Sequence, residues 1–178
     1  RAIPDALYHH VLDRVHHIDV GLAASLQLAR VMGLRGQEAV QCCQSLKTWD
    51  KQLEKGAERL PVIFGTKGGR PRMTQVIDRE AVRQAVKEAL EITGGRDGHL
   101  IDKPDLKSAM DYWHNNLRNA GLTGEYSPHS LRYAWAQDAI RYYEEQGLSQ
   151  KEALAVTSTD LGHGDGRGRY IEQVYNRT

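Results

Sequence analysis

The chain has 178 residues and a mass of 20.0 kDa, which predicts one domain and excludes a second large one. Hydrophobic residues make up 40% of it and charged residues 26%, enough apolar material for a core and too much for intrinsic disorder. Lys and Arg number 24 against 23 Asp and Glu, so the net charge of +1 does not by itself indicate a nucleic-acid-binding protein. The longest uncharged stretch, 20–29, is about half the length of a membrane-spanning helix, which excludes such a segment.

The two cysteines, Cys42 and Cys43, are neighbours in a segment with a helical pattern. Successive side chains of a helix point in different directions, so we expect reduced thiols, as in a cytoplasmic protein. The chain begins with Arg1 and without a signal-peptide pattern, so we expect a fragment of a longer intracellular protein.

Helical periodicity dominates the first part of the chain. Apolar residues at positions 7, 11 and 15, and again at 22, 26 and 29, predict two helices between Pro4 and Gly33. A third, short helix is expected from about Gly36 to Cys43.

A different pattern follows between Leu60 and Val76. Two runs rich in β-formers, 62–64 and 73–77, flank the pair Gly68-Gly69, which predicts an antiparallel hairpin.

Four further helices are predicted between the hairpin and residue 161. The first has apolar residues at i, i+3, i+4, i+7 and i+8 from Val82 and ends at Gly94-Gly95, and the second covers 106–120. The others are expected to begin with Ser127 as N-cap before Pro128 and with a capping box of Ser149 and Glu152. They should end near Gln146 and Asp160, before a glycine-rich loop, 161–169, and a short terminal helix. The expected fold is therefore mainly α with a small antiparallel β-sheet, in the α+β class.

Four elements along this chain bear residues suited to chemistry. Arg35 stands at a helix start with Glu38 three residues on, and Lys67 lies in the hairpin turn among other basic residues: Arg59, Arg70 and Arg72. His129 and Arg132 are spaced i, i+3 on one helix face, and Leu161-Gly162-His163 precedes the last tyrosines. Taken singly, each element is more often a cap, a solvated turn or a glycine-rich loop than a site.

In this order, the elements resemble the catalytic domain of the tyrosine recombinases, the phage-type integrases, across almost the whole chain. The resemblance implies that Arg35, Lys67, His129, Arg132 and His163 are catalytic, with Glu38 as the accompanying acid. It also implies a tyrosine nucleophile shortly after His163. The chain, 1–178, would then be the catalytic domain, without the family's N-terminal DNA-binding domain.

The spacing to that tyrosine departs from the family pattern. Glu172 occupies the position where the family usually has its tyrosine, and the available residues are Tyr170 and Tyr175. Tyr175 needs a longer loop, which the glycines of 164–168 can supply, and Tyr170 needs a shorter one. We favour Tyr175, and Tyr170 stays an alternative.

These residue types suit attack by a phenolate on a DNA phosphodiester. Arginine side chains neutralise charge on the five-coordinate phosphorus without a metal, so no cofactor or metal is expected. The imidazole of His129 is suited to take the tyrosine proton, and Lys67 to protonate the leaving 5′ oxygen. A covalent 3′-phosphotyrosine conserves the bond energy for rejoining.

Site-specific DNA recombination is thus the predicted function, with double-stranded DNA and a homotetramer on paired sites as partners. The expected location is the cytoplasm, on the nucleoid if the source is bacterial. Two alternatives remain: relaxation of DNA like a type IB topoisomerase, and a catalytically silent DNA-binding domain.

Other motifs have structural interpretations. The pairs His9-His10 and His16-His17 lack further metal ligands and fit a solvated helix face. The aromatic residues Trp113, Trp135, Tyr142 and Tyr143 are expected in helix packing.

Overall fold

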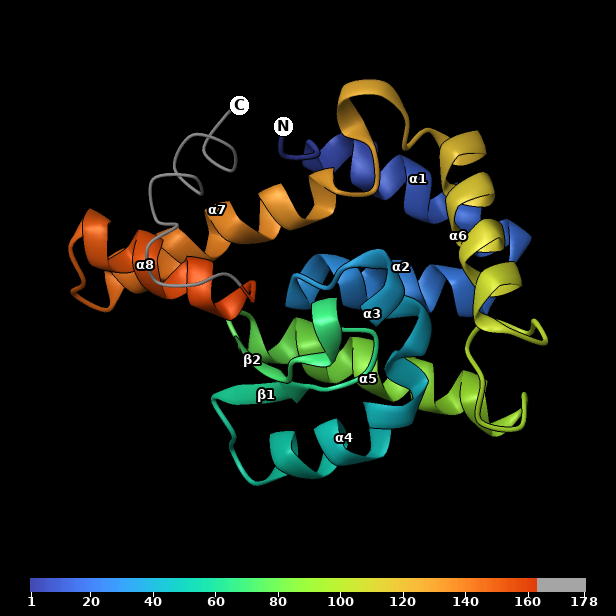
Figure 1. Cartoon of the computed structure of the whole chain (residues 1–178), viewed down its shortest axis with the longest axis horizontal. Helices are drawn as coiled ribbons and strands as arrows, with labels where there is room; N and C mark the ends of the chain where they lie inside the picture. Colours follow the sequence, from blue (N-terminus) through green and yellow to red (C-terminus); the bar gives the residue numbers. More distant parts are fainter. Residues whose placement is uncertain (163–178) are drawn as a thin grey trace.

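The computed structural model of the chain describes residues 1–162, which form a mainly helical structure around one small sheet (Figure 1). Strands β1 (Arg59–Val62) and β2 (Arg72–Gln75) pair antiparallel. The α-helices of the described part are α1 (Asp5–Ile18), α2 (Val20–Met32), α3 (Gly36–Gln41), α4 (Leu46–Glu54), α5 (Arg79–Gly94), α6 (Leu106–Ala120), α7 (Ser130–Glu145) and α8 (Gln150–Asp160). The expected fold class is confirmed.

The first two predicted helices are confirmed, and their junction is a tight cap. The Asp19 carboxylate accepts hydrogen bonds from the backbone N–H groups of Gly21 and Leu22, which begins α2. Gly33, in the left-handed conformation with φ of 69°, ends it. Four histidines of α1 are exposed, as expected for a solvated face: His9, His10, His16 and His17.

The predicted third helix is shorter than expected, and α4 was not predicted. Helix α3 ends at Gln41, and both cysteines lie in the 3₁₀ helix η1 (Cys42–Ser45), with Cys42 buried and both thiols free. In α4, Leu46, Trp49 and Leu53 are buried at i, i+3 and i+7, a helical stripe that the sequence already contained.

The hairpin is confirmed, but its first strand was placed too late. Strand β1 begins at Arg59, paired with Gln75, and ends at Val62, paired with Arg72. The expected strand residues 63–64 belong instead to the long connection between the strands, which contains the 3₁₀ turn η2 (Lys67–Gly69). Gly65 in this connection has φ of 78°, a conformation that interrupts an extended strand.

Helices α5, α6 and α8 end close to the predicted residues, whereas α7 begins later than predicted. Ser127 is not its N-cap: the carbonyl of Ser127 accepts the N–H of Ser130 at 2.8 Å, so a separate turn precedes the helix. The capping box of α8 is confirmed, since Ser149 and Glu152 exchange side-chain and backbone hydrogen bonds.

Helix α2 lies at the centre of the fold and contacts α1, α3, α5 and α7. Figure 1 shows α6 at one end of the molecule and the α7–α8 pair at the other, with the hairpin and α4 below α2. The side chains of Trp49, Trp113 and Trp135 are fully buried, Tyr143 is buried and Tyr142 is partly buried. The aromatic residues therefore pack helices, as predicted. This arrangement brings the α2–α3 turn, the hairpin and the end of α8 together.

Candidate functional site

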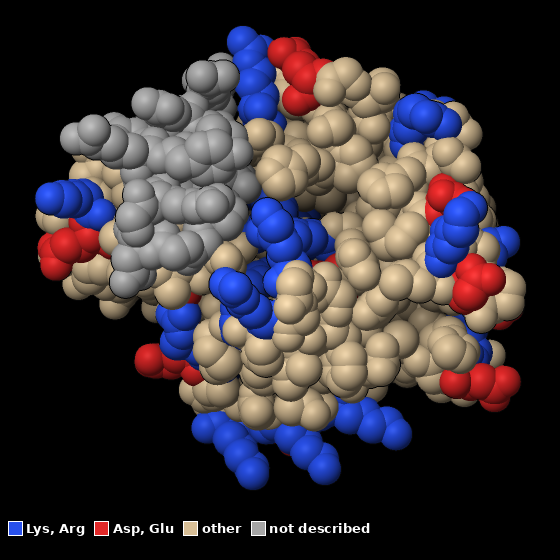
Figure 2. Space-filling view, in the orientation of Figure 1, with Lys and Arg blue, Asp and Glu red and all other residues tan. Residues whose placement is uncertain are grey.

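A pocket of about 740 Å³ lies where the hairpin connection meets the α2–α3 turn and the end of α8. We call it the central pocket. Figure 2 shows Lys and Arg side chains gathered near the middle of the face drawn there, beside a hollow. The residues that line the pocket are Arg35, Glu38, Arg59, Thr66, Lys67, Gly68, Arg70, Pro71, Arg72, Met73, Thr159, Leu161 and Gly162.

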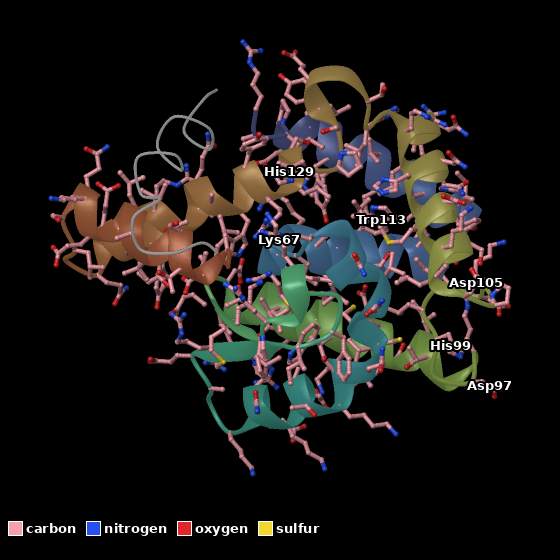
Figure 3. All side chains as sticks on the ribbon, in the orientation of Figure 1. Lys67, Asp97, His99, Asp105, Trp113 and His129 are labelled. Carbon is pink, nitrogen blue, oxygen red and sulfur yellow. The ribbon has the colours of Figure 1, made fainter. Side chains whose placement is uncertain are left out.

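Arg35 enters the central pocket from the N-cap position of α3. Its backbone N–H donates to the Glu38 carboxylate at 2.8 Å, which fixes the first turn of this helix. A Cβ atom on Gly36 would lie 2.9 Å from Nε1 of Trp113, which Figure 3 shows projecting from α6 towards the molecule's centre. Within residues 1–162, the Arg35 guanidinium has no hydrogen-bond or ion-pair partner.

Lys67 reaches the same pocket from the exposed turn η2. Gly68 and Gly69 follow it with φ values of 67° and 71°, and this left-handed backbone lets the loop turn sharply. No described carboxylate forms an ion pair with Lys67 or with the nearby Arg70. Within residues 1–162, neither cation is therefore offset by an acidic side chain.

Arg132, expected to share the site, lies buried behind the pocket with 1% of its surface exposed. Its Nε donates to the carbonyl of Gly33 at 3.1 Å, and its Nη2 donates to the carbonyl of Leu161 at 2.6 Å. These bonds join the end of α2 to the end of α8.

His129 precedes α7, and its ring contacts Tyr133 edge-on at a centroid distance of 5.1 Å. Partial desolvation, together with the positive charges of Arg132 and Arg35, lowers the pKa of His129 to about 4. The imidazole is therefore neutral near pH 7, and the lowered pKa makes it a weaker base than an ordinary histidine. His129 is not among the residues that line the central pocket, and Figure 3 labels it at the start of α7, above Lys67 in this view.

Two arginines predicted as part of a local basic cluster are instead paired with acids. Arg72 binds both oxygens of Glu38, at 3.0 Å from Nε and 2.7 Å from Nη2. Arg59 forms an ion pair with Asp160. Because the partners are far away along the chain, no local pattern could have shown these pairs.

The electrostatics of the two acids differ. Burial alone would raise the pKa of Glu38, but the hydrogen bonds and charge of Arg72, the N–H of Arg35 and the charge of Arg132 hold it below its usual value. Asp160 is fully buried, and this burial raises its pKa although Tyr143 and Arg59 donate hydrogen bonds to it. Glu38 is thus a fixed negative charge beside the pocket.

Three predicted residues, His163, Tyr170 and Tyr175, lie outside the described residues. In the part of the chain that the structure describes, no group of three or more His, Cys, Asp or Glu side chains could hold a metal ion. Among the helices of residues 1–162, none is both long and apolar enough to cross a bilayer.

The fold is mainly helical, and its central pocket is lined by Arg35 and Lys67, which have no carboxylate partner among residues 1–162. The model of a protein family described as Integrase matches residues 1–138, which is most of the chain. The chain therefore belongs to the integrases, the tyrosine recombinase family of phages, whose activity is site-specific DNA recombination. The matched range contains Arg35, Lys67, His129 and Arg132 and ends before α8. No curated protein and no solved structure matches the chain.

Proposed function

We propose that this chain cuts and rejoins DNA by metal-independent transesterification through a covalent 3′-phosphotyrosine. The main support for the proposal is that the cations lining the pocket fall into two groups, those paired with carboxylates and those without a described carboxylate partner. Arg59 and Arg72 are neutralised by carboxylates, whereas Arg35 and Lys67 face the central pocket with no carboxylate partner in the described residues. Arg35 is half-buried and Lys67 is exposed at the edge of the pocket. Since a partly buried cation without a carboxylate partner is unfavourable, Arg35 beside a second cation is typical of a site that receives an anion.

In the proposed reaction, the oxygen of Tyr175 attacks the phosphorus and the bond to the 5′ oxygen breaks. The phenol proton goes to the neutral imidazole of His129, and Lys67 gives a proton to the 5′ oxygen as it leaves. Arg35 binds the non-bridging oxygens, where negative charge develops, and Arg132 adds a second positive charge held in a fixed orientation. His163 donates a further hydrogen bond to the phosphate. Attack by the free 5′ hydroxyl of another strand reverses these steps and releases the tyrosine.

The proposal gives the whole chain, 1–178, the role of a catalytic domain that acts on double-stranded DNA. We propose a homotetramer on paired sites, and association with the nucleoid if the source is bacterial. With a net charge of +1, the isolated chain should bind DNA weakly and with strong salt dependence.

Covalent trapping tests this proposal. The substrate is a pool of duplexes that carry a nick beside a randomised sequence. After cleavage close to the nick, the short fragment with the free 5′ hydroxyl diffuses away and cannot be rejoined. The covalent adduct therefore accumulates. We expect the wild-type chain to form an adduct that survives denaturing electrophoresis, and sequencing of the trapped DNA yields a defined suicide duplex. The adduct should vanish in Tyr175→Phe and persist in Tyr170→Phe.

Three other results of the trapping experiment would each change the interpretation. The reverse pattern of the two variants makes Tyr170 the nucleophile. Relaxation of supercoiled plasmid without any preferred site would favour topoisomerase activity. Duplex binding without an adduct in the wild type would indicate a catalytically silent DNA-binding domain and contradict the proposal.

A further inference from the structure

Arg72, the first residue of β2, lines the central pocket, and four of the five N–H donors of its guanidinium bind within the protein. Its side chain is 6% exposed. Nε and Nη2 bind the Glu38 carboxylate, Nη2 also donates to the carbonyl of Gly33 at 3.3 Å, and Nη1 donates to the carbonyl of Asp160. All three guanidinium nitrogens are therefore engaged within the protein.

Arg72 and Arg132 hold the same two segments of backbone from different elements. The carbonyl of Gly33 accepts from both arginines, at 3.3 Å and 3.1 Å. The consecutive carbonyls of Asp160 and Leu161 accept from Arg72 and Arg132 respectively. Two guanidinium groups thus fix the end of α8 against the end of α2.

The side chain of Arg72 also fills the space beside Gly162. A Cβ atom on Gly162 would lie 3.2 Å from Cδ of Arg72, and the residue has φ of 90°. A Cβ atom at this position would require the Arg72 side chain to shift slightly, and the left-handed backbone adds strain. Gly162 immediately precedes His163, the histidine expected to bind the phosphate.

Arg72 is connected to the predicted phosphate ligands on both sides. Through Glu38, which accepts the N–H of Arg35 at 2.8 Å, it supports the turn that carries Arg35. Through Asp160 and Gly162 it supports the segment that leads to His163.

We infer that Arg72 is a positioning residue for the proposed reaction: it sets the segment 160–162 against the Arg35 turn and does not itself bind DNA. This inference rests on the proposed function. A displacement of about 1 Å at a catalytic group can slow a reaction roughly a hundredfold, so a residue of this kind affects rate more than affinity.

The test is Arg72→Lys, assayed in the full chain with the suicide duplex recovered from the randomised pool. Lysine keeps the charge beside Glu38, but its single ammonium cannot reproduce the planar set of donors to Glu38, Gly33 and Asp160. We expect the single-turnover rate of adduct formation at saturating duplex to fall by at least about tenfold. The Kd for the duplex should change by less than about threefold, because no DNA contact is removed.

Arg79→Lys is the matched control. Arg79 also donates to three backbone carbonyls, those of Leu53, Gly56 and Ala57, but it does not line the central pocket. We expect this variant to lose a similar amount of thermal stability and to keep the wild-type rate. A general loss of stability would instead slow both variants alike.

A second pair of variants covers the case in which Arg72→Lys does not fold. Gly162→Ala and Gly147→Ala place alanine at φ of 90° and 99°, but only Gly162 lies against Arg72, since Gly147 has open space around it. We expect Gly162→Ala to slow adduct formation at saturating duplex and Gly147→Ala to leave it unchanged.

The outcomes separate the two proposals. A wild-type chain that forms no adduct contradicts the proposed function, and the inference falls with it. A wild-type adduct with an equal rate in Arg72→Lys, or in Gly162→Ala, contradicts the inference alone. A weaker Kd whose effect disappears at saturating duplex would make Arg72 a DNA contact, which also overturns it.

Discussion

Gly65 lies so close to Gln37 that a Cβ atom on it would stand 2.6 Å from the Gln37 carbonyl oxygen. The loop that carries Lys67 is therefore packed against the first turn of α3, which carries Arg35. The contact between Gly65 and Gln37 thus links the positions of Lys67 and Arg35, which both line the central pocket.

Alanine at Gly65 should separate these two residues. The substitution combines a left-handed φ of 78° with a clash against backbone, so the loop must move away from α3. We expect adduct formation to slow by about tenfold or more. Gly56→Ala is the control, because its φ is 84° but no atom lies within 4 Å of the added Cβ. Equal rates in the two variants would mean that the contact with α3 does not position Lys67.

Arg35→Lys should reduce the rate of adduct formation by roughly 10²–10³, the usual loss when one donor to a developing oxyanion is removed. Lysine keeps the charge but not the planar fork that binds two phosphate oxygens. The exposed side chain of Arg118 on α6 bonds only to Asn115 among the described residues, and Arg118→Lys should leave the rate unchanged. Single-turnover rates with the suicide duplex measure both effects, and a loss below about threefold would remove Arg35 from the reaction.

Lys67→Gln should have two separate effects. Loss of one phosphate contact should make the dependence of the logarithm of the binding constant on the logarithm of salt concentration less steep, by about 0.9. Duplex binding at several salt concentrations measures this slope. Loss of a proton donor should slow cleavage, and a duplex with a bridging 5′ sulfur should restore the rate, because a thiolate leaves without a proton. Lys47→Gln, at an exposed lysine of α4, provides the control for charge alone. A rate that stays low with the sulfur substrate would exclude Lys67 as the acid.

The low pKa of His129 predicts how the stability of the folded chain depends on pH. Its pKa in the folded chain is about 4, below the unfolded value of about 6.5, so the unfolded state binds more protons between these values. Its contribution to stability is therefore complete above about pH 6.5 and is lost as the pH falls towards 4. NMR titration of the ring, assigned with His129→Gln, should show a midpoint near pH 4.

Binding of an anion should move that midpoint upward. A duplex phosphate beside His129 would offset the charges of Arg35 and Arg132, which now lower its pKa. The same titration with saturating duplex measures this change. A midpoint near 6.5 in the free chain, or one that DNA leaves unchanged, would contradict the arrangement of charges described above.

The sequence was sufficient for most elements because their ends are coded locally. Gly121 after α6 and the capping box of Ser149 and Glu152 act within a few residues, so the predicted bounds agree with the structure. Local sequence patterns misplaced the ends of elements whose backbone is positioned by contacts with residues far away in the chain. Helix α7 begins three residues after Ser127, and β1 ends before Ile63 because the following loop is drawn against α3.

For the site, the order of the amino acids alone showed which residue types are present, and this order resembles the integrase family to which the chain belongs. Which cations lack a carboxylate partner among residues 1–162 depends on how the chain folds. Arg59 and Arg72 looked like equals of Lys67 in one basic turn, yet they meet Asp160 and Glu38, 101 and 34 residues away. An ion pair depends on distance in space, and chain neighbours do not reveal that distance until the helices and the hairpin have packed together.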